Sequence, residues 1–141
     1  MKSRLLAAII CVSLLCGTAY AHHSFAGTYI LDQRATIEGT LVSFVIQNPH
    51  SFVTVDVKGA DGKIRTWAVE WGGVTQLTQT GVTAATLKVG DKISVTGAPA
   101  KATDELKVLM RKIERPTDGW SWEGETGSRY GFASSAEPAA K

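Results

Sequence analysis

Short segments rich in β-branched and aromatic residues, each bounded by a turn signal, most constrain what this chain can fold into. They cover residues 35–47, 50–57, 63–71, 91–98 and 105–115. Apolar residues alternate along the second segment, where Val53, Val55 and Val57 project to one side of an extended backbone. Asn48-Pro49 and residues 59–62 are turn signals between the first three segments. The pattern predicts five β-strands.

One short helix is expected between the third and fourth strands. Val74 and Leu77 are three residues apart, and Gly81 suits the left-handed position at a helix C-terminus, so the helix is predicted over residues 74–80. Thr83 is a candidate cap for one further helical turn. Three strands, a helix and two strands, with a bend in the first strand at Gly39, is the order of an OB-like five-stranded barrel. We therefore predict a mainly β fold with this barrel at residues 35–115.

The first 21 residues have the three parts of a secretory signal peptide. Lys2 and Arg4 provide the positive start, residues 5–16 form an apolar run, and Ala19-Tyr20-Ala21 ends in small residues. The apolar run is shorter than the roughly 20 residues that a membrane-spanning helix needs. We expect a Sec-type leader at 1–21 that is cleaved after Ala21, export to the periplasm, and no membrane partner after processing.

The expected cleavage leaves an N-terminal segment at 22–34 and a tail at 116–141 that is rich in Gly, Ala and Ser, with Trp120 and Trp122 as anchors. Both cysteines lie in the leader, so the processed chain has no disulfide or thiolate ligand. Removing Lys2 and Arg4 from the 15 basic residues leaves 13, against 13 acidic residues. Since nucleic-acid binding depends on neutralising phosphates, this balance predicts no nucleic-acid partner.

The turn at Asn48-Pro49 determines how the first two strands face each other. A two-residue loop there places Phe44 opposite Val53 and Val42 opposite Val55. These apolar side chains then point into the predicted barrel.

The turn at residues 59–62 leaves two registers open for the third strand. An even-length turn adds Ala68 and Ile64 to the interior face. The opposite face then exposes three aromatic side chains as a candidate ligand-binding surface: Phe52, Trp67 and Trp71. A three-residue loop with Gly62 as a bulge instead swaps the faces of the third strand and brings Glu70 beside His50.

The three histidines of the chain suggest a metal site. Cleavage after Ala21 makes His22 the N-terminal residue, whose amine and ring nitrogen can chelate one ion, with His23 and His50 as further candidate ligands. Nitrogen-rich tetragonal sites favour Cu(II). Cleavage after Ala19 places His22 third, which is another copper chelate. The alternative without metal is a solvated His22-His23 pair and a hydrogen-bonded turn histidine at position 50. Zinc is less favoured because no acidic or cysteine cluster completes a tetrahedron.

Four stretches together resemble a known bacterial family. They are AHHSF at 21–25, NPHSF at 48–52, WAVEW at 67–71 and LKVGDKISVTG at 87–97. Small exported proteins classed as a domain of unknown function have an HHSF start and an NPHS motif of this kind. The resemblance covers about residues 21–115. It implies periplasmic export and an OB-like barrel, and it brings no established activity.

The residue pattern contains no Ser-His-acid arrangement, thiol nucleophile or phosphate loop, so we predict a binding protein rather than an enzyme. Its expected partner is a small ligand or a metal ion, with Cu(II) bound through His22, His23 and His50. The alternative is a docking module for a periplasmic partner protein or a polymer such as a glycan, with Phe52, Trp67 and Trp71 forming the docking surface.

Overall fold

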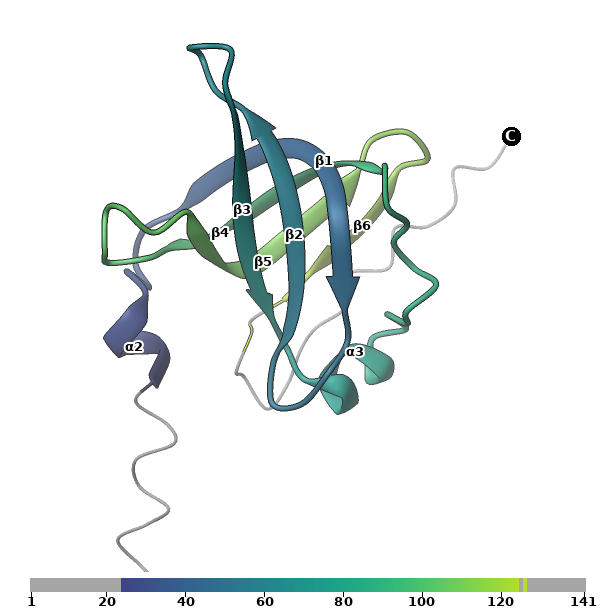
Figure 1. The fold of residues 1–141 in the computed structure, drawn as a ribbon. Coiled ribbons are helices and arrows are strands. Elements are labelled where there is room, and N and C mark those ends of the chain that lie inside the picture. The colour runs from purple at the N-terminus through teal and green to yellow at the C-terminus, as the bar shows by residue number, and fades with distance from the viewer. Residues whose placement is uncertain (1–23, 125, 127–141) are drawn as a thin grey trace, which may run out of the picture.

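The structure is a computed structural model that describes residues 24–124 and residue 126, and it has a curved, closed sheet (Figure 1). The strands are β1 (Ala35–Val45), β2 (Ser51–Lys58), β3 (Ile64–Trp71), β4 (Lys92–Pro99), β5 (Lys107–Arg115) and β6 (Trp120–Glu123). The helices are α2 (Ser24–Thr28) and α3 (Val74–Gln79). No helix among residues 24–124 is long and apolar enough to cross a membrane. The expected leader and both neighbouring histidines, His22 and His23, lie outside the described residues.

The first five strands close into a barrel. The strand order is β3-β2-β1-β4-β5-β6, and a further pairing between β3 and β5 joins the two sides. That closing pairing is parallel and short, running from Ala68–Lys107 to Glu70–Leu109. The predicted mainly β, OB-like five-stranded barrel with one short helix between the third and fourth strands is confirmed.

Strand β1 serves both sides of the barrel because it changes partner in its middle. It pairs with β4 up to Thr40 and with β2 from Thr40 onward. The adjacent Gly39 lies so close to β2 that an added Cβ would be 2.3 Å from the carbonyl oxygen of Asp56. The bend expected at Gly39 is therefore a place where only a residue without a side chain allows this approach.

The barrel interior is apolar, and Trp122 of β6 completes it. The fully buried large side chains include Leu41, Val53, Val55, Val69, Trp71, Leu77, Met110, Ile113 and Trp122. Trp122 comes from β6, which pairs with the end of β5 from Lys112 to Arg115. Strand β6 lies in the tail at 116–141, which is rich in Gly, Ala and Ser, and was not among the five predicted strands.

Helix α3 matches the predicted helix, but the second helical turn does not form. Residues 83–86 make a single hydrogen-bonded turn, with the Thr86 N–H donating to the Thr83 carbonyl at 2.9 Å. The Thr83 hydroxyl accepts from the Ala85 N–H at 3.3 Å. Thr83 thus makes the local contact expected of a cap, without a helix to follow.

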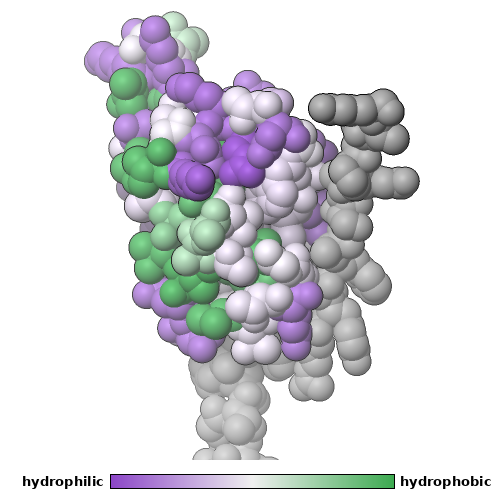
Figure 2. Space-filling model, turned by 90° about the vertical axis from the view of Figure 1, so that its right-hand side faces the viewer, coloured by the Kyte–Doolittle hydropathy of each residue, from purple (hydrophilic) through white to green (hydrophobic). Residues whose placement is uncertain are grey.

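The β1–β2 register agrees with prediction near the turn and departs from it further along. Phe44 lies opposite Val53, as expected. An irregularity between Leu41 and Ser43 then puts Leu41, rather than Val42, opposite Val55. Val42 is consequently 40% exposed, which corrects its predicted interior position. Figure 2 shows the side of the molecule that is on the right in Figure 1, with apolar surface along one edge and hydrophilic residues at its upper end.

The β2–β3 hairpin adopts the alternative register. Gly62 has a φ of 78°, and the Gly59 N–H donates to the Lys63 carbonyl at 2.8 Å, which closes a three-residue loop. Val53 therefore faces Val69 instead of Ala68. Ala68 and Ile64 leave the predicted interior face, and Ile64 is 68% exposed.

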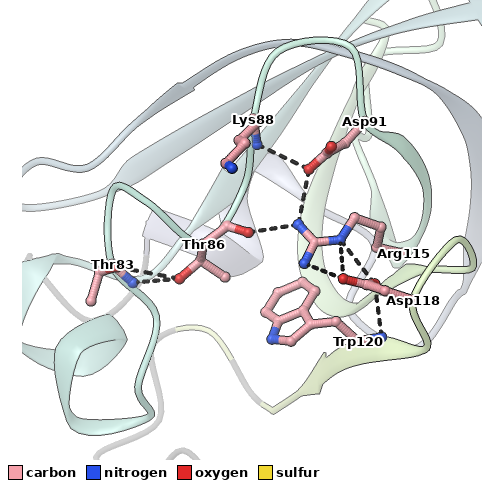
Figure 3. A network of polar contacts seen from close by, with 7 residues as sticks. All are labelled: Thr83, Thr86, Lys88, Asp91, Arg115, Asp118 and Trp120. Carbon is pink, nitrogen blue, oxygen red and sulfur yellow. Dashed lines mark hydrogen bonds and ion pairs between the residues drawn. The ribbon is translucent and has the colours of Figure 1, made fainter.

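Arg115 at the end of β5 joins the loop before β4 to the turn before β6 (Figure 3). Its guanidinium donates to the Thr86 carbonyl at 2.7 Å, to Asp91 at 2.9 Å and to Asp118 at 2.8 Å. The Trp120 ring lies 5.5 Å from the guanidinium carbon. The hydrogen bond from Arg115 is the main reason that the pKa of Asp118 is lowered.

Candidate functional site

His50 and Glu70 form the centre of the candidate site. His50 immediately precedes β2, and Glu70 is the residue of β3 that pairs with Phe52. In the observed register both side chains lie on the outer face, and Nδ1 of His50 is 2.7 Å from Oε1 of Glu70. The His50 side chain is 31% exposed, whereas that of Glu70 is only 10% exposed. The pairing expected only in the alternative register is therefore present.

Two further residues hold the other oxygen of the Glu70 carboxylate. The hydroxyl of Tyr29 donates to Oε2 at 2.5 Å, and Nζ of Lys107 lies 3.4 Å from the same oxygen. Lys107 arrives here because barrel closure pairs it with Ala68 of β3. Its ammonium also lies 5.3 Å from the centre of the Tyr29 ring, a cation–π distance.

Tyr29 is only 1% exposed, and its environment favours the protonated phenol. Burial raises the pKa of Tyr29 strongly above its ordinary value, and the hydrogen bond to Glu70 and its negative charge add to the effect. The phenol therefore stays a hydrogen-bond donor to the carboxylate well into the alkaline range.

Residues 24–30, which we call the N-terminal strap, cover this site. The strap is attached to the barrel by backbone hydrogen bonds from Ile30 to Pro99 at 2.9 Å and from Lys101 to Thr28 at 2.8 Å. The ring of Phe25 packs on the ring of His50, with centroids 4.9 Å apart. The strap thus brings the chain that directly follows His22 and His23 to the edge of the His50 ring. Its helical turn, α2, was not predicted.

The three predicted metal ligands can be placed only in part. His50 is in the site, and His22 and His23 lie outside the described residues. Within residues 24–124 and 126, no group of three or more His, Cys, Asp or Glu side chains is arranged to hold a metal ion. A metal site with three protein ligands at His50 therefore needs ligands from outside the described residues.

The predicted aromatic surface does not form, because the bulge at Gly62 swaps the faces of β3. Trp71 is 0% exposed in the core, and Trp67 is partly buried against the same core. Phe52 lies on the other face, opposite Glu70. The expectation that Phe52, Trp67 and Trp71 share one ligand-binding face is wrong, and the docking alternative loses the surface it required.

The chain matches the model of one known protein family. Residues 8–109 match DUF6152, described as a family of unknown function. The chain belongs to DUF6152. The match confirms the predicted resemblance to a family of unknown function. Two further points stay predictions: that the HHSF and NPHS motifs are typical of this family, and that the protein is exported. No curated protein matches this DUF6152 chain.

Solved structures align with part of this chain. Two crystal forms of the mitochondrial single-stranded DNA-binding protein Rim1 from S. cerevisiae align with this DUF6152 chain. One has 12% identity and a TM-score of 0.45 over 58% of this chain and 92% of that chain. The other has 11% identity and a TM-score of 0.46 over 69% of this chain and 98% of that chain. A ZRD-deleted mutant of TiaS in complex with agmatine has 18% identity and a TM-score of 0.44 over 69% of this chain and 23% of that chain. The likeness concerns the fold alone.

These neighbours correct one expectation about partners. The near-neutral processed chain was taken to exclude nucleic acid, whereas similar solved structures include single-stranded DNA-binding proteins. The prediction of no nucleic-acid partner is therefore not retained for this chain. The correction removes an exclusion and assigns no nucleic acid to the DUF6152 chain.

Proposed function

We propose that this DUF6152 protein is exported, is not an enzyme, and binds Cu(II) at the N-terminus of its processed chain. The ligands are the terminal amine and ring of His22 together with the ring of His50, with His23 beside them. The observation that carries the proposal is the packing of Phe25 on His50, with ring centroids 4.9 Å apart.

Chain length makes the ligand set reachable. His22 is three residues before Phe25, and an extended chain spans about 3.3–3.6 Å per residue, or about 10 Å in all. A chain that starts at His22 thus has its amine within reach of a ring that already contacts Phe25. An imidazole, a free amine and a second imidazole give the nitrogen-rich set that favours Cu(II).

The contact of His50 with Glu70 also suits a metal ligand. Histidines that bind metals usually donate one ring N–H to a carboxylate or carbonyl, which orients the other nitrogen toward the ion. Here Nδ1 faces Glu70 at 2.7 Å, and no hydrogen bond joins Nε2 to a residue in the described part of the chain. Nε2 of His50 is the nitrogen available for the ion.

The proposal includes export, on the evidence of the leader pattern at residues 1–21. Signal cleavage creates the ligand, because only a cut after Ala21 frees the amine of His22. Affinity should fall in acid, since an α-amine with a pKa near 7.7–8.0 must lose its proton to bind metal.

The test begins with the exported protein. Mass spectrometry should find His22 as the first residue, and a Cu(II) titration should give a d–d band and nitrogen hyperfine structure in electron paramagnetic resonance. A variant with three alanines before His22 keeps every side chain but removes the terminal chelate. Three are needed because one or two would place a histidine third, which is itself a copper chelate.

Mutating a residue that only hydrogen-bonds to a metal ligand typically weakens metal binding about 10- to 100-fold. We expect the extended variant and His50→Gln each to weaken Cu(II) binding by more than that, because each removes a ligand. Unchanged affinity in the extended variant contradicts the terminal-amine site. Unchanged affinity and spectrum in His50→Gln contradict the role of the barrel.

A further inference from the structure

The carboxylate of Glu70 is shared between a barrel histidine and the N-terminal strap. Oε1 lies 2.7 Å from Nδ1 of His50, and Oε2 accepts from the Tyr29 hydroxyl and lies 3.4 Å from Nζ of Lys107. An ionised carboxylate only accepts hydrogen bonds, so each proton in this cluster belongs to the partner of Glu70. The contact with His50 consequently requires a proton on Nδ1.

The position of that proton determines which ring nitrogen can act. In a neutral imidazole one nitrogen carries hydrogen and the other carries a lone pair. With Nδ1 occupied toward Glu70, the lone pair is on Nε2, which makes no hydrogen bond to any residue among 24–124. The His50 side chain is 31% exposed, so solvent and ligands can approach the ring.

Glu70 itself is held in one orientation. Its side chain is 10% exposed, and both oxygens are engaged by groups from separate segments: the strap, the start of β2 and the start of β5. If the carboxylate rotated away from its present orientation, Tyr29 would lose its hydrogen-bond acceptor and Lys107 would lose its counter-charge. The loss of these two contacts opposes any reorientation of the carboxylate.

We propose that Glu70 is a positioning residue that holds His50 as the Nδ1–H tautomer and leaves Nε2 as the free donor nitrogen. Tyr29 and Lys107 maintain the orientation of Glu70, so the strap, which follows the expected metal chelate in the chain, also orients the barrel ligand. The use of Nε2 for metal rests on the proposed function, whereas the tautomer does not.

The closing experiment uses the exported protein without metal, labelled with ¹⁵N at histidine. Long-range ¹H–¹⁵N correlation spectra distinguish the two neutral tautomers of His50 by their nitrogen shifts. The wild type should show the hydrogen on Nδ1. In Glu70→Gln the neutral amide is a weaker acceptor and can donate to Nδ1, so the Nε2–H tautomer should gain population.

A matched control is Glu114→Gln on β5, which removes an exposed carboxylate that pairs with Lys112 at 2.9 Å. It should leave the His50 spectrum unchanged, and thermal unfolding shows whether either variant has lost its fold. If copper binds the wild type, Glu70→Gln should weaken that binding about 10- to 100-fold, and the control should not.

The outcomes separate the two proposals. Wild-type His50 with its hydrogen on Nε2, or a tautomer that does not change in folded Glu70→Gln, overturns the positioning role. An Nδ1–H tautomer that depends on Glu70 in a protein that binds no copper supports the positioning role and rejects the proposed function.

Discussion

The ring of Trp122 packs edge-on against the ring of Trp71, with centroids 4.9 Å apart and planes at 68°. Trp71 ends β3, and Trp122 belongs to β6, which follows the last strand of the barrel. The indole N–H of Trp122 also donates to the Thr80 hydroxyl at 3.0 Å, just after α3. Strand β6 is thus part of the core at the end of the barrel where α3 lies.

Replacing Trp122 tests this role in the core. Trp122 is 2% exposed, so Trp122→Ala removes a large buried side chain and should lower the free energy of unfolding by about 3–5 kcal/mol. Urea unfolding followed by circular dichroism measures the loss. Trp120→Ala on the same strand removes a ring that is only partly buried and should cost clearly less. Equal losses for the two variants would contradict the packing described.

The close approach at Gly39 leads to a second prediction. An added Cβ would lie 2.3 Å from the Asp56 carbonyl oxygen and 2.7 Å from a methyl carbon of Val55, so Gly39→Ala must displace backbone. We expect a loss of about 1–3 kcal/mol in the free energy of unfolding. Gly27→Ala in α2 is the control, because nothing lies within 4 Å of its added Cβ. That variant should be neutral or slightly stabilising, since alanine favours the helix. A harmless Gly39→Ala would show that β1 and β2 are further apart.

Tyr29 makes the stability sensitive to alkaline pH. Its folded pKa is raised above the ordinary value of 10.0, chiefly by burial, so its contribution is complete below pH 10.0 and falls as the pH rises. Above that pH the unfolded chain releases the phenol proton while the folded protein retains it. Wild-type stability should therefore decline more steeply above pH 10 than that of Tyr29→Phe, which lacks the titrating group. Chemical unfolding at pH 8 to 11 provides the comparison, and identical slopes would speak against a buried, hydrogen-bonded phenol.

At neutral pH the same variant should be less stable. Tyr29→Phe keeps the ring but removes one donor to Glu70, and a lost hydrogen bond to a charged group costs about 1.5–3 kcal/mol. A midpoint of urea unfolding equal to that of the wild type at pH 7 would contradict the hydrogen bond.

Arg115 leads to a prediction at acid pH. The backbone N–H of Lys88 and the guanidinium of Arg115 hold the pKa of Asp91 below its ordinary 3.8, and Arg115 does the same for the pKa of Asp118. Their stabilisation is present above pH 3.8 and is lost as the pH falls through the lowered folded values. Arg115→Lys cannot reproduce the forked contacts, so acid unfolding should begin at higher pH.

Arg65→Lys is the control for the arginine chemistry. Arg65 pairs with Asp61 in an exposed hairpin at 2.8 Å, and exposed ion pairs contribute little to stability. Acid-unfolding curves that shift equally in the two variants would show that the contacts of Arg115 have no special role.

Local patterns were enough to locate most of the elements. The predicted second strand, residues 50–57, corresponds to β2 at Ser51–Lys58, because alternating Val53, Val55 and Val57 suit a half-buried extended chain in any fold. The helix predicted at 74–80 corresponds to α3 for the same local reason. Strand β6 was missed because its short segment lies among glycine-rich residues and is ordered by Trp122 entering a core built by distant strands.

The site was only partly accessible from sequence. His50 was predicted, and Glu70 appeared beside it only in one of two open registers. Tyr29 and Lys107 carry no local signal, since a single tyrosine or lysine looks the same whether it faces solvent or a buried carboxylate. Phe25 belongs to the AHHSF stretch at 21–25, but the stretch does not indicate that its ring packs on His50. A signal that could have pointed to Glu70 is its place between Val69 and Trp71, a charge in an otherwise apolar strand end.

The amino-acid order by itself therefore determined the five barrel strands, their sequence along the chain and the barrel class, because alternation and turn chemistry act between near neighbours. Only the tertiary structure decided which face each side chain of β3 occupies. One residue more or less in the loop at Gly62 inverts that strand, and burial of Trp71 against Trp122 stabilises the observed choice. Barrel closure then brought Lys107 and the N-terminal strap to Glu70, across distances along the chain that no local pattern encodes.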